Sequence, residues 1–192
     1  MPVIDSRLLD CDTPSEITED FNRLAGMVDA VSDTLAPVVS DTESAYAEIY
    51  VAANTTAVSV AASASFVVLV PPGEVSGRAH NFTINTSAGT VTSELTGLYY
   101  VSATFSSKLG TADVVWDTAV FVNDEEAENL HMRRRFSTAG YTFNVCICGL
   151  VVLAEDDVLD VRVKHNNAGA VNITTEYANI SLYRIGAAPE EA

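Results

Sequence analysis

The sequence is poor in basic residues and has no long apolar run, and both shortages exclude classes of protein. It holds 10 Lys and Arg against 26 Asp and Glu, which gives a net charge of −16 at pH 7. Because phosphate binding needs clustered cations, this balance argues against nucleic acid and anionic membranes as partners. No stretch approaches the roughly 18 apolar residues of a membrane span, and the first residues lack the pattern of a secretory signal. We expect a soluble protein made in a cytoplasm.

Cysteine and histidine are also scarce. An odd count of cysteines, Cys11, Cys146 and Cys148, does not form a disulfide framework. In an extended strand Cys146 and Cys148 point the same way, so we expect both to be buried as small hydrophobes rather than to form a metal or redox site. The histidines have no metal-ligand spacing. The sequence predicts neither a metal nor a cofactor.

Catalytic signatures are missing as well. There is no G-x-S-x-G elbow, no H-E-x-x-H and no glycine-rich phosphate loop. The acidic run 155–157 could hold calcium in a turn, although a solvated β-turn is favoured. We therefore predict that the protein is not an enzyme and has no catalytic residues.

What the chain does contain is period-two alternation. Apolar residues make up 48% of 192 residues, enough for one β-domain and an appendage. Strands at regular spacing between turn residues predict a sandwich or barrel. Segment 97–107 puts Tyr99, Val101, Ala103 and Phe105 on one face, and 141–153 is apolar on both faces, as in a central covered strand. The ten predicted strands are 47–52, 56–61, 65–71, 81–85, 89–95, 97–107, 114–124, 141–153, 157–169 and 171–185.

A heptad helix precedes the strands. Thr13, Pro14 and Glu16 form a start signal with a capping box, and Pro37 ends the run. Such a short helix, weakened by Gly26, needs a partner. That partner is either its own copies, preferably three, or another surface, or the β-domain of the same chain. The apolar stripe for anchoring or trimerisation is Ile17, Phe21, Leu24, Val28, Val31 and Leu35.

Several motifs together resemble a known family. Gly97-x-Tyr99-x-Val101 is followed by a strand ending in Asn123-Asp124, then by 153–161, and finally by 179–183. This order is similar to the jelly roll of tumour necrosis factor and of the globular head of complement component one q. It is closer still to phage and bacterial versions, which open with a strand like 48–51. The resemblance covers 47–186 and departs from the family at Asp156, where a glycine is usual.

The resemblance implies an all-β, ten-strand, two-sheet jelly-roll sandwich that forms homotrimers. Trimers of this family bury one sheet face at the threefold axis, and we assign Tyr99, Tyr177 and Tyr183 to it. The opposite side of the last strand carries Ala178, Ile180 and Leu182. Threefold heads would bring three N-terminal helices together. The predicted divisions are an arm at 1–12, the heptad helix at 13–37, a linker at 38–46, the head at 47–186 and a flexible tail at 187–192.

The only basic cluster is Arg133, Arg134 and Arg135, within 131–137. In a strand, Arg133 and Arg135 share the face opposite Arg134. The cluster could be a ligand patch for a sulfated or acidic glycan. The favoured alternative is pairing across a subunit boundary with the acids of 123–129, because arginine is enriched at interfaces.

The combined prediction is a virion structural protein, most simply of a bacteriophage. It would be a trimeric capsid decoration or head-fibre protein, anchored to the capsid or another virion protein by its N-terminal segment and displayed on the particle, with a host surface glycan as a possible further partner. The alternative is the receptor- or glycan-binding tip of a tail fibre or bacterial surface appendage. A signalling trimer like the animal cytokines fits less well, because no secretory signal is seen.

Overall fold

A computed structural model describes residues 22–29, 43–69 and 75–189. Residues 44–192 form one compact unit and residues 1–43 another. Twelve strands lie in the described part of the larger unit: β1 (Tyr46–Val51), β2 (Val58–Val60), β3 (Ser63–Val68), β4 (Val75–His80), β5 (Phe82–Asn85), β6 (Thr90–Ser93), β7 (Gly97–Leu109), β8 (Val114–Val122), β9 (Glu125–Phe136), β10 (Thr142–Leu153), β11 (Val158–His165) and β12 (Val171–Gly186).

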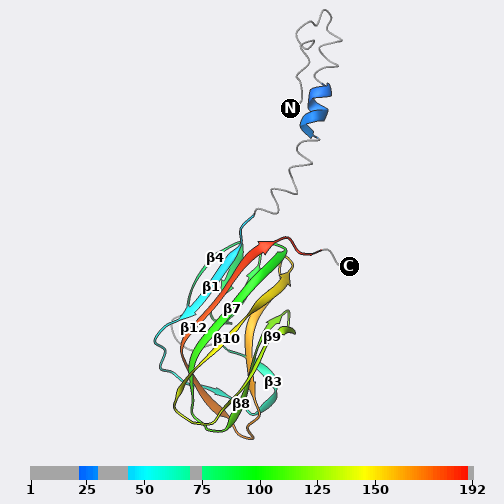
Figure 1. Cartoon of the computed structure of the whole chain (residues 1–192). Coiled ribbons are helices and arrows are strands. Elements are labelled where there is room, and N and C mark those ends of the chain that lie inside the picture. Colours follow the sequence, from blue (N-terminus) through cyan, green and yellow to red (C-terminus); the bar gives the residue numbers. More distant parts are fainter. Residues whose placement is uncertain (1–21, 30–42, 70–74, 190–192) are drawn as a thin grey trace, which may run out of the picture. The chain divides into compact units, whose positions relative to one another are not determined.

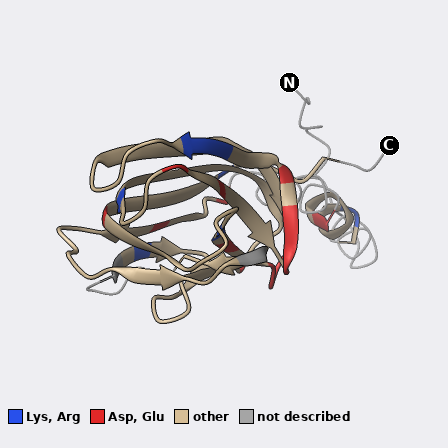
Figure 2. Ribbon diagram, turned by 90° about the horizontal axis from the view of Figure 1, so that it is seen from below, with Lys and Arg blue, Asp and Glu red and all other residues tan. Residues whose placement is uncertain are grey.

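The strands form two antiparallel six-stranded sheets. The first sheet has the order β10-β7-β12-β1-β4, with β2 paired to β12, and Figure 1 shows these five strands side by side. The second sheet has the order β5-β6-β11-β8-β9, with β3 paired to β11. Seen along the strands in Figure 2, the sheets make two layers, and most of the ribbon carries neither charge colour. This is the all-β, two-sheet sandwich that the sequence predicts.

The inner faces of the two sheets form the core, because alternate residues of each strand turn inward. The predicted set Tyr99, Val101, Ala103 and Phe105 on β7 is buried, as are Leu159, Val161 and Val163 on β11. On β12 the inward positions are Ala178, Ile180 and Leu182, also as predicted. The largest fully buried side chain is Trp116 of β8, which stacks on His165 of β11 with ring centroids 5.8 Å apart.

Two strands were not among the ten predicted from alternation, β4 and β9. Neither has the alternation of buried and exposed side chains from which strands were predicted, and residues 77–80 of β4 are all exposed. The buried positions of β9 do not alternate, and its sequence EEAENLHMRRRF is largely polar. The count is therefore twelve rather than ten, while the fold class is the one predicted.

The expectation for 141–153 is wrong. β10 is an edge strand of the first sheet, not a central one. Its inward residues Val145, Ile147 and Leu153 are buried, but Leu150 and Val152 on its other side are exposed. The strand has apolar side chains on both faces, but within one copy of the chain only the inward face is buried.

Two turns have the left-handed backbone that their residue types favour. Asn123 and Asp124 connect β8 to β9 with φ of 50° and 68°, as in a two-residue hairpin loop. Asp156, in the turn before β11, has φ of 70°. This is the position where the resembling family has glycine, so Asp156 keeps a conformation that glycine adopts without strain.

The smaller unit contributes one described element, the helix of residues 22–29, inside the predicted span 13–37. Leu24 and Val28 of the apolar stripe are 54% and 61% exposed. The helix is neither long nor apolar enough to cross a membrane, and no other described helix is. The arm at 1–12, the stripe residues Ile17, Phe21, Val31 and Leu35, and the end of the tail lie outside the described residues.

Candidate self-association face

The outer face of the first sheet collects exposed aromatic and apolar side chains. Tyr177 and Tyr183 of β12 are 54% and 48% exposed, and they point away from the core on the side opposite Ala178, Ile180 and Leu182. We call this surface the tyrosine face. Its residues are Tyr46, Tyr50, Tyr100, Tyr177 and Tyr183, with Cys146, Cys148, Leu150 and Val152 of β10.

Strand register brings three of the tyrosines into one row across the sheet. Tyr183 of β12 pairs with Tyr46 of β1 on one side and with Tyr100 of β7 on the other. The rings of Tyr100 and Tyr183 have centroids 5.2 Å apart, a distance typical of packed aromatic pairs. The row continues to Leu150 of β10, the register partner of Tyr100. The sheet itself therefore holds a continuous apolar band in place.

This face carries few charges in a chain that is strongly acidic. β10 has no charged residue, and the only one on β7 is Lys108. Glu48 of β1 is the register partner of Arg78 on β4, and its carboxylate accepts a hydrogen bond of 2.7 Å from the amide of Asn179. The negative charge of the molecule thus lies largely elsewhere.

The face has a hollow over β1, β7, β10 and β12. A cavity of about 450 Å³ is lined by Tyr50, Cys146 and Tyr177, among other residues of β1, β7, β10 and β12. Nearby, a hydrogen bond to Cys148 and the negative charge of the thiolate form of that side chain raise the pKa of Tyr100. A tyrosine is a neutral phenol at physiological pH in any case, which suits a surface that packs against an apolar partner.

One residue assigned to the trimer axis does not belong to this face. Tyr99 is 0% exposed and lies inside the sandwich, where its ring packs on Phe82 and its hydroxyl donates to the carbonyl of Leu95. Burial raises its pKa. Adjacent strand residues face opposite ways, so the neighbour Tyr100 takes the outer position. The prediction is wrong for Tyr99, while Tyr177 and Tyr183 do share an exposed face.

The other members of the face were missed, although the alternation in the sequence could have found two of them. Tyr46 and Tyr50 are four residues apart in a strand and flank the buried Ala47 and Ile49, so period two puts both outward. The expectation of buried thiols is also wrong, because Cys146 and Cys148 are exposed free cysteines. They share a face, as expected, but it is the uncovered face of β10.

The three arginines divide between two faces, as predicted, and have different partners. Arg133 forms two hydrogen bonds, of 2.6 and 3.1 Å, to the carboxylate of Asp117 on β8. Arg135 bonds Asp113, at 3.0 Å. Arg134 donates to the main-chain carbonyl of Asn144 on β10, at 2.9 Å. The carboxylates that hold Arg133 and Arg135 come from residues 113–117 of the same chain rather than from the expected 123–129.

Asp117 is the most enclosed of these acids. Burial alone would raise the pKa of its carboxyl, but the hydrogen bonds from Arg133 and His131 outweigh that effect and lower it. His131 lies between two carboxylates, with Nε2 3.0 Å from Asp117 and Nδ1 2.6 Å from Glu126. His131 is thus part of a charge network within the second sheet.

One of the three acids in the turn considered for calcium, Asp157, already accepts hydrogen bonds within the chain. Asp157 accepts hydrogen bonds from the side-chain amide of Asn123, at 2.6 Å, and from the main-chain N–H of Ala154, at 2.7 Å. Within residues 22–29, 43–69 and 75–189, no group of three or more His, Cys, Asp or Glu side chains is placed to hold a metal ion.

Solved structures match this fold at low sequence identity. The structure of Eiger TNF from S. frugiperda superposes with a TM-score of 0.53 at 17% identity, over 78% of this chain and 98% of that one. Murine APRIL at pH 5.0 gives a TM-score of 0.48 at 12% identity, over 74% and 100% of the two chains. No family model and no curated protein matches the sequence. The likeness to Eiger establishes a jelly-roll fold like that of tumour necrosis factor.

Proposed function

We propose that this chain is a structural protein that assembles as a homotrimer through the tyrosine face and is displayed on a virus particle. The single observation that carries the assembly is that face: a row of tyrosines flanked by the exposed apolar side of β10. Contiguous exposed apolar surface of this kind marks interaction sites in soluble proteins. Tyrosine suits such a site, because its ring buries area while its hydroxyl keeps a polar partner.

A second copy of the same chain is the partner that this face fits best. With a net charge of −16, copies repel each other, and contact is favourable only where charge is sparse. The tyrosine face is such a region, since β10 has no charged residue. Closed cyclic symmetry would cover the face on every copy and leave none exposed.

The particle anchor in this proposal is the N-terminal segment. Leu24 and Val28 continue the heptad spacing and are exposed on the described helix. The segment is also acidic, with Asp and Glu outnumbering basic residues over 1–48. An exposed apolar stripe beside acidic residues fits docking on a basic surface of the shell.

Mass in solution tests the assembly. Sedimentation or native mass spectrometry of the full chain should give three copies of 20.4 kDa. Tyr183→Glu should yield a folded single copy, because it buries an unpaired charge at the proposed contact. The matched control is Val67→Glu on β3 of the second sheet, which is also partly exposed and should remain assembled. A wild-type protein that stays a single copy would overturn the homotrimer.

The anchoring role needs a separate test. The double variant Leu24→Asp and Val28→Asp should still assemble through its head but should be absent from density-purified particles that contain the wild-type chain. A virion role is excluded if the wild-type chain itself never copurifies with particles. Because this readout is distinct from the solution mass, the two halves of the proposal can fail independently.

A further inference from the structure

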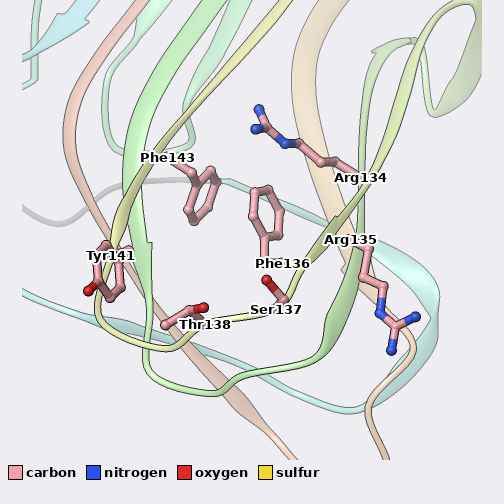
Figure 3. Close-up of a pocket in the computed structure, with 7 residues that line it drawn as sticks. All are labelled: Arg134, Arg135, Phe136, Ser137, Thr138, Tyr141 and Phe143. Atoms are coloured by element: carbon pink, nitrogen blue, oxygen red, sulfur yellow. The ribbon is translucent and has the colours of Figure 1, made fainter.

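A second surface, where β9 leads into β10, has the composition of a ligand pocket. β9 ends at Phe136, β10 begins at Thr142, and the loop between them borders a cavity of about 280 Å³. We call it the Arg134 pocket. Figure 3 shows its lining: Arg134, Arg135, Phe136, Ser137, Thr138, Tyr141 and Phe143.

Arg134 is the cation that this pocket offers to a ligand. The carboxylates of Asp117 and Asp113 neutralise Arg133 and Arg135, and Figure 3 shows Arg135 extending in the opposite direction from Arg134. Arg134 instead contacts a main-chain carbonyl and the ring of Phe136, with its guanidinium carbon 5.5 Å from the ring centroid. No carboxylate in the described part of the chain forms an ion pair with Arg134. Its charge and its remaining N–H groups are available, because a guanidinium has five donors.

The walls of the pocket are aromatic and its floor carries hydroxyls. The rings of Phe136 and Phe143 lie with centroids 3.9 Å apart, and Figure 3 shows them side by side next to Arg134. Tyr141 is 73% exposed, and Ser137 and Thr138 on the connecting loop are exposed as well. Aromatic surface with a few placed polar groups is the usual lining of a small-molecule site. The volume is near the lower end of the roughly 300–1,000 Å³ of such sites, which suits a ligand of one or two rings.

The charge of the whole molecule restricts the ligand further. A net charge of −16 repels polyanions such as nucleic acid or a heavily sulfated chain, and one unpaired arginine cannot offset that repulsion. A ligand with a single carboxylate and no other charge is repelled much less. Its carboxylate can form bidentate hydrogen bonds with a guanidinium. A sugar ring supplies the uncharged body of such a ligand, with a C–H face for the partly exposed Phe143, which packs on the buried Phe136, and hydroxyl groups for Ser137 and Thr138.

We propose that the Arg134 pocket binds a saccharide that carries a carboxylate, such as a uronic acid unit. The carboxylate pairs with the Arg134 guanidinium, and the sugar ring lies between Phe143 and Tyr141. All the residues involved come from β9, β10 and the loop that joins them. The site is therefore complete within one copy of the chain.

Titration of the full chain with methyl glucuronide, followed by NMR or calorimetry, tests this assignment, and methyl glucoside is the neutral comparison. We expect saturable binding of the glucuronide at millimolar or lower concentration and at least tenfold weaker binding of the glucoside. Arg134→Gln should weaken glucuronide binding at least tenfold. Lys164→Gln removes the same charge from β11, where Lys164 lies over Phe66, and should leave the affinity unchanged. Tyr141→Ser changes an exposed loop residue and should also weaken binding without loss of fold.

Several results would overturn the proposal. Equal affinity for the glucuronide and the glucoside would remove the role of the carboxylate. Equal losses in Arg134→Gln and Lys164→Gln would show general attraction to positive charge. Saturable binding of inorganic phosphate or of an acidic peptide, with none of the glucuronide, would assign the pocket to another class of ligand. Absence of saturable glucuronide binding to the wild-type chain also contradicts it.

Discussion

At the scale of single residues, the ion pair at Asp117 links stability to pH. The pKa of Asp117 in the folded chain is lowered, so its stabilising contribution is complete above the ordinary carboxyl pKa of about 3.9 and is lost as pH falls through the folded value. Asp117→Asn should lower the free energy of unfolding by about 1–3 kcal/mol near neutral pH, because it breaks charged hydrogen bonds at a nearly buried site.

Urea unfolding of both proteins at several pH values measures this effect. The difference between wild type and Asp117→Asn should shrink as pH falls below about 4, where the carboxyl of the unfolded chain takes up a proton while that of the folded chain, with its lowered pKa, stays ionised. Thr118→Ser on the same strand changes no titrating group. Its free energy of unfolding should therefore differ from that of the wild type by an amount independent of pH. A constant difference for Asp117→Asn across the acid range would contradict the prediction.

The left-handed turn at Asp156 gives a second prediction for a single residue. Its φ of 70° is tolerated by Asp, adopted freely by Gly and strained for β-branched residues. Asp156→Val should therefore reduce the free energy of unfolding by about 1–2 kcal/mol, whereas Asp156→Gly should change it by less than about 1 kcal/mol. Thermal and urea unfolding would compare the two, and equal losses would indicate that the side chain matters rather than the backbone.

At the scale of elements, the two sides of β10 are covered to very different degrees within one copy of the chain. One side packs in the core, and the other exposes Cys146 and Cys148. If assembly covers the tyrosine face, both thiols should react with a disulfide reagent at least tenfold more slowly in the wild type than in Tyr183→Glu. Reaction under native conditions, with mass spectrometry to assign each site, measures this. Equal rates in the two proteins would show that β10 remains uncovered.

The strands that the sequence predicts are those in which apolar residues on one face are buried in the core. β7, β11 and β12 alternate because their inward residues enter the core, so the residues facing inward could be predicted correctly, Ala178 and Ile180 among them. β4 and β9 could not be predicted in this way, because the side chains of residues 77–80 in β4 are all exposed and the buried positions of β9 do not alternate.

The site was predictable to a lesser degree than the fold. Tyr177 and Tyr183 follow from the period of β12, but the assignment of Tyr99 to the trimer axis conflicts with the same period on β7. Its companions Val101 and Ala103 point to the core, and they identify Tyr99 as the inner one. The Arg134 pocket depends on a contact between β9 and β10, which lie in different sheets, so no spacing within one strand indicates it.

At the scale of the whole molecule, the separation of charge from the tyrosine face predicts how assembly responds to salt. Copies with a net charge of −16 repel each other, while the proposed contact is formed mainly by tyrosines and apolar residues. Salt screens the repulsion over a Debye length of about 10 Å at 0.1 M and has little effect on apolar burial. The dissociation constant of the assembly should therefore fall as salt rises from about 0.01 to 0.15 M.

Sedimentation equilibrium at fixed protein concentrations measures this dissociation constant. Val67→Glu adds negative charge outside the tyrosine face and should show a steeper dependence on salt. An assembly that weakens with salt would instead indicate a contact dominated by ion pairs between copies, and the tyrosine face would then not be the principal interface.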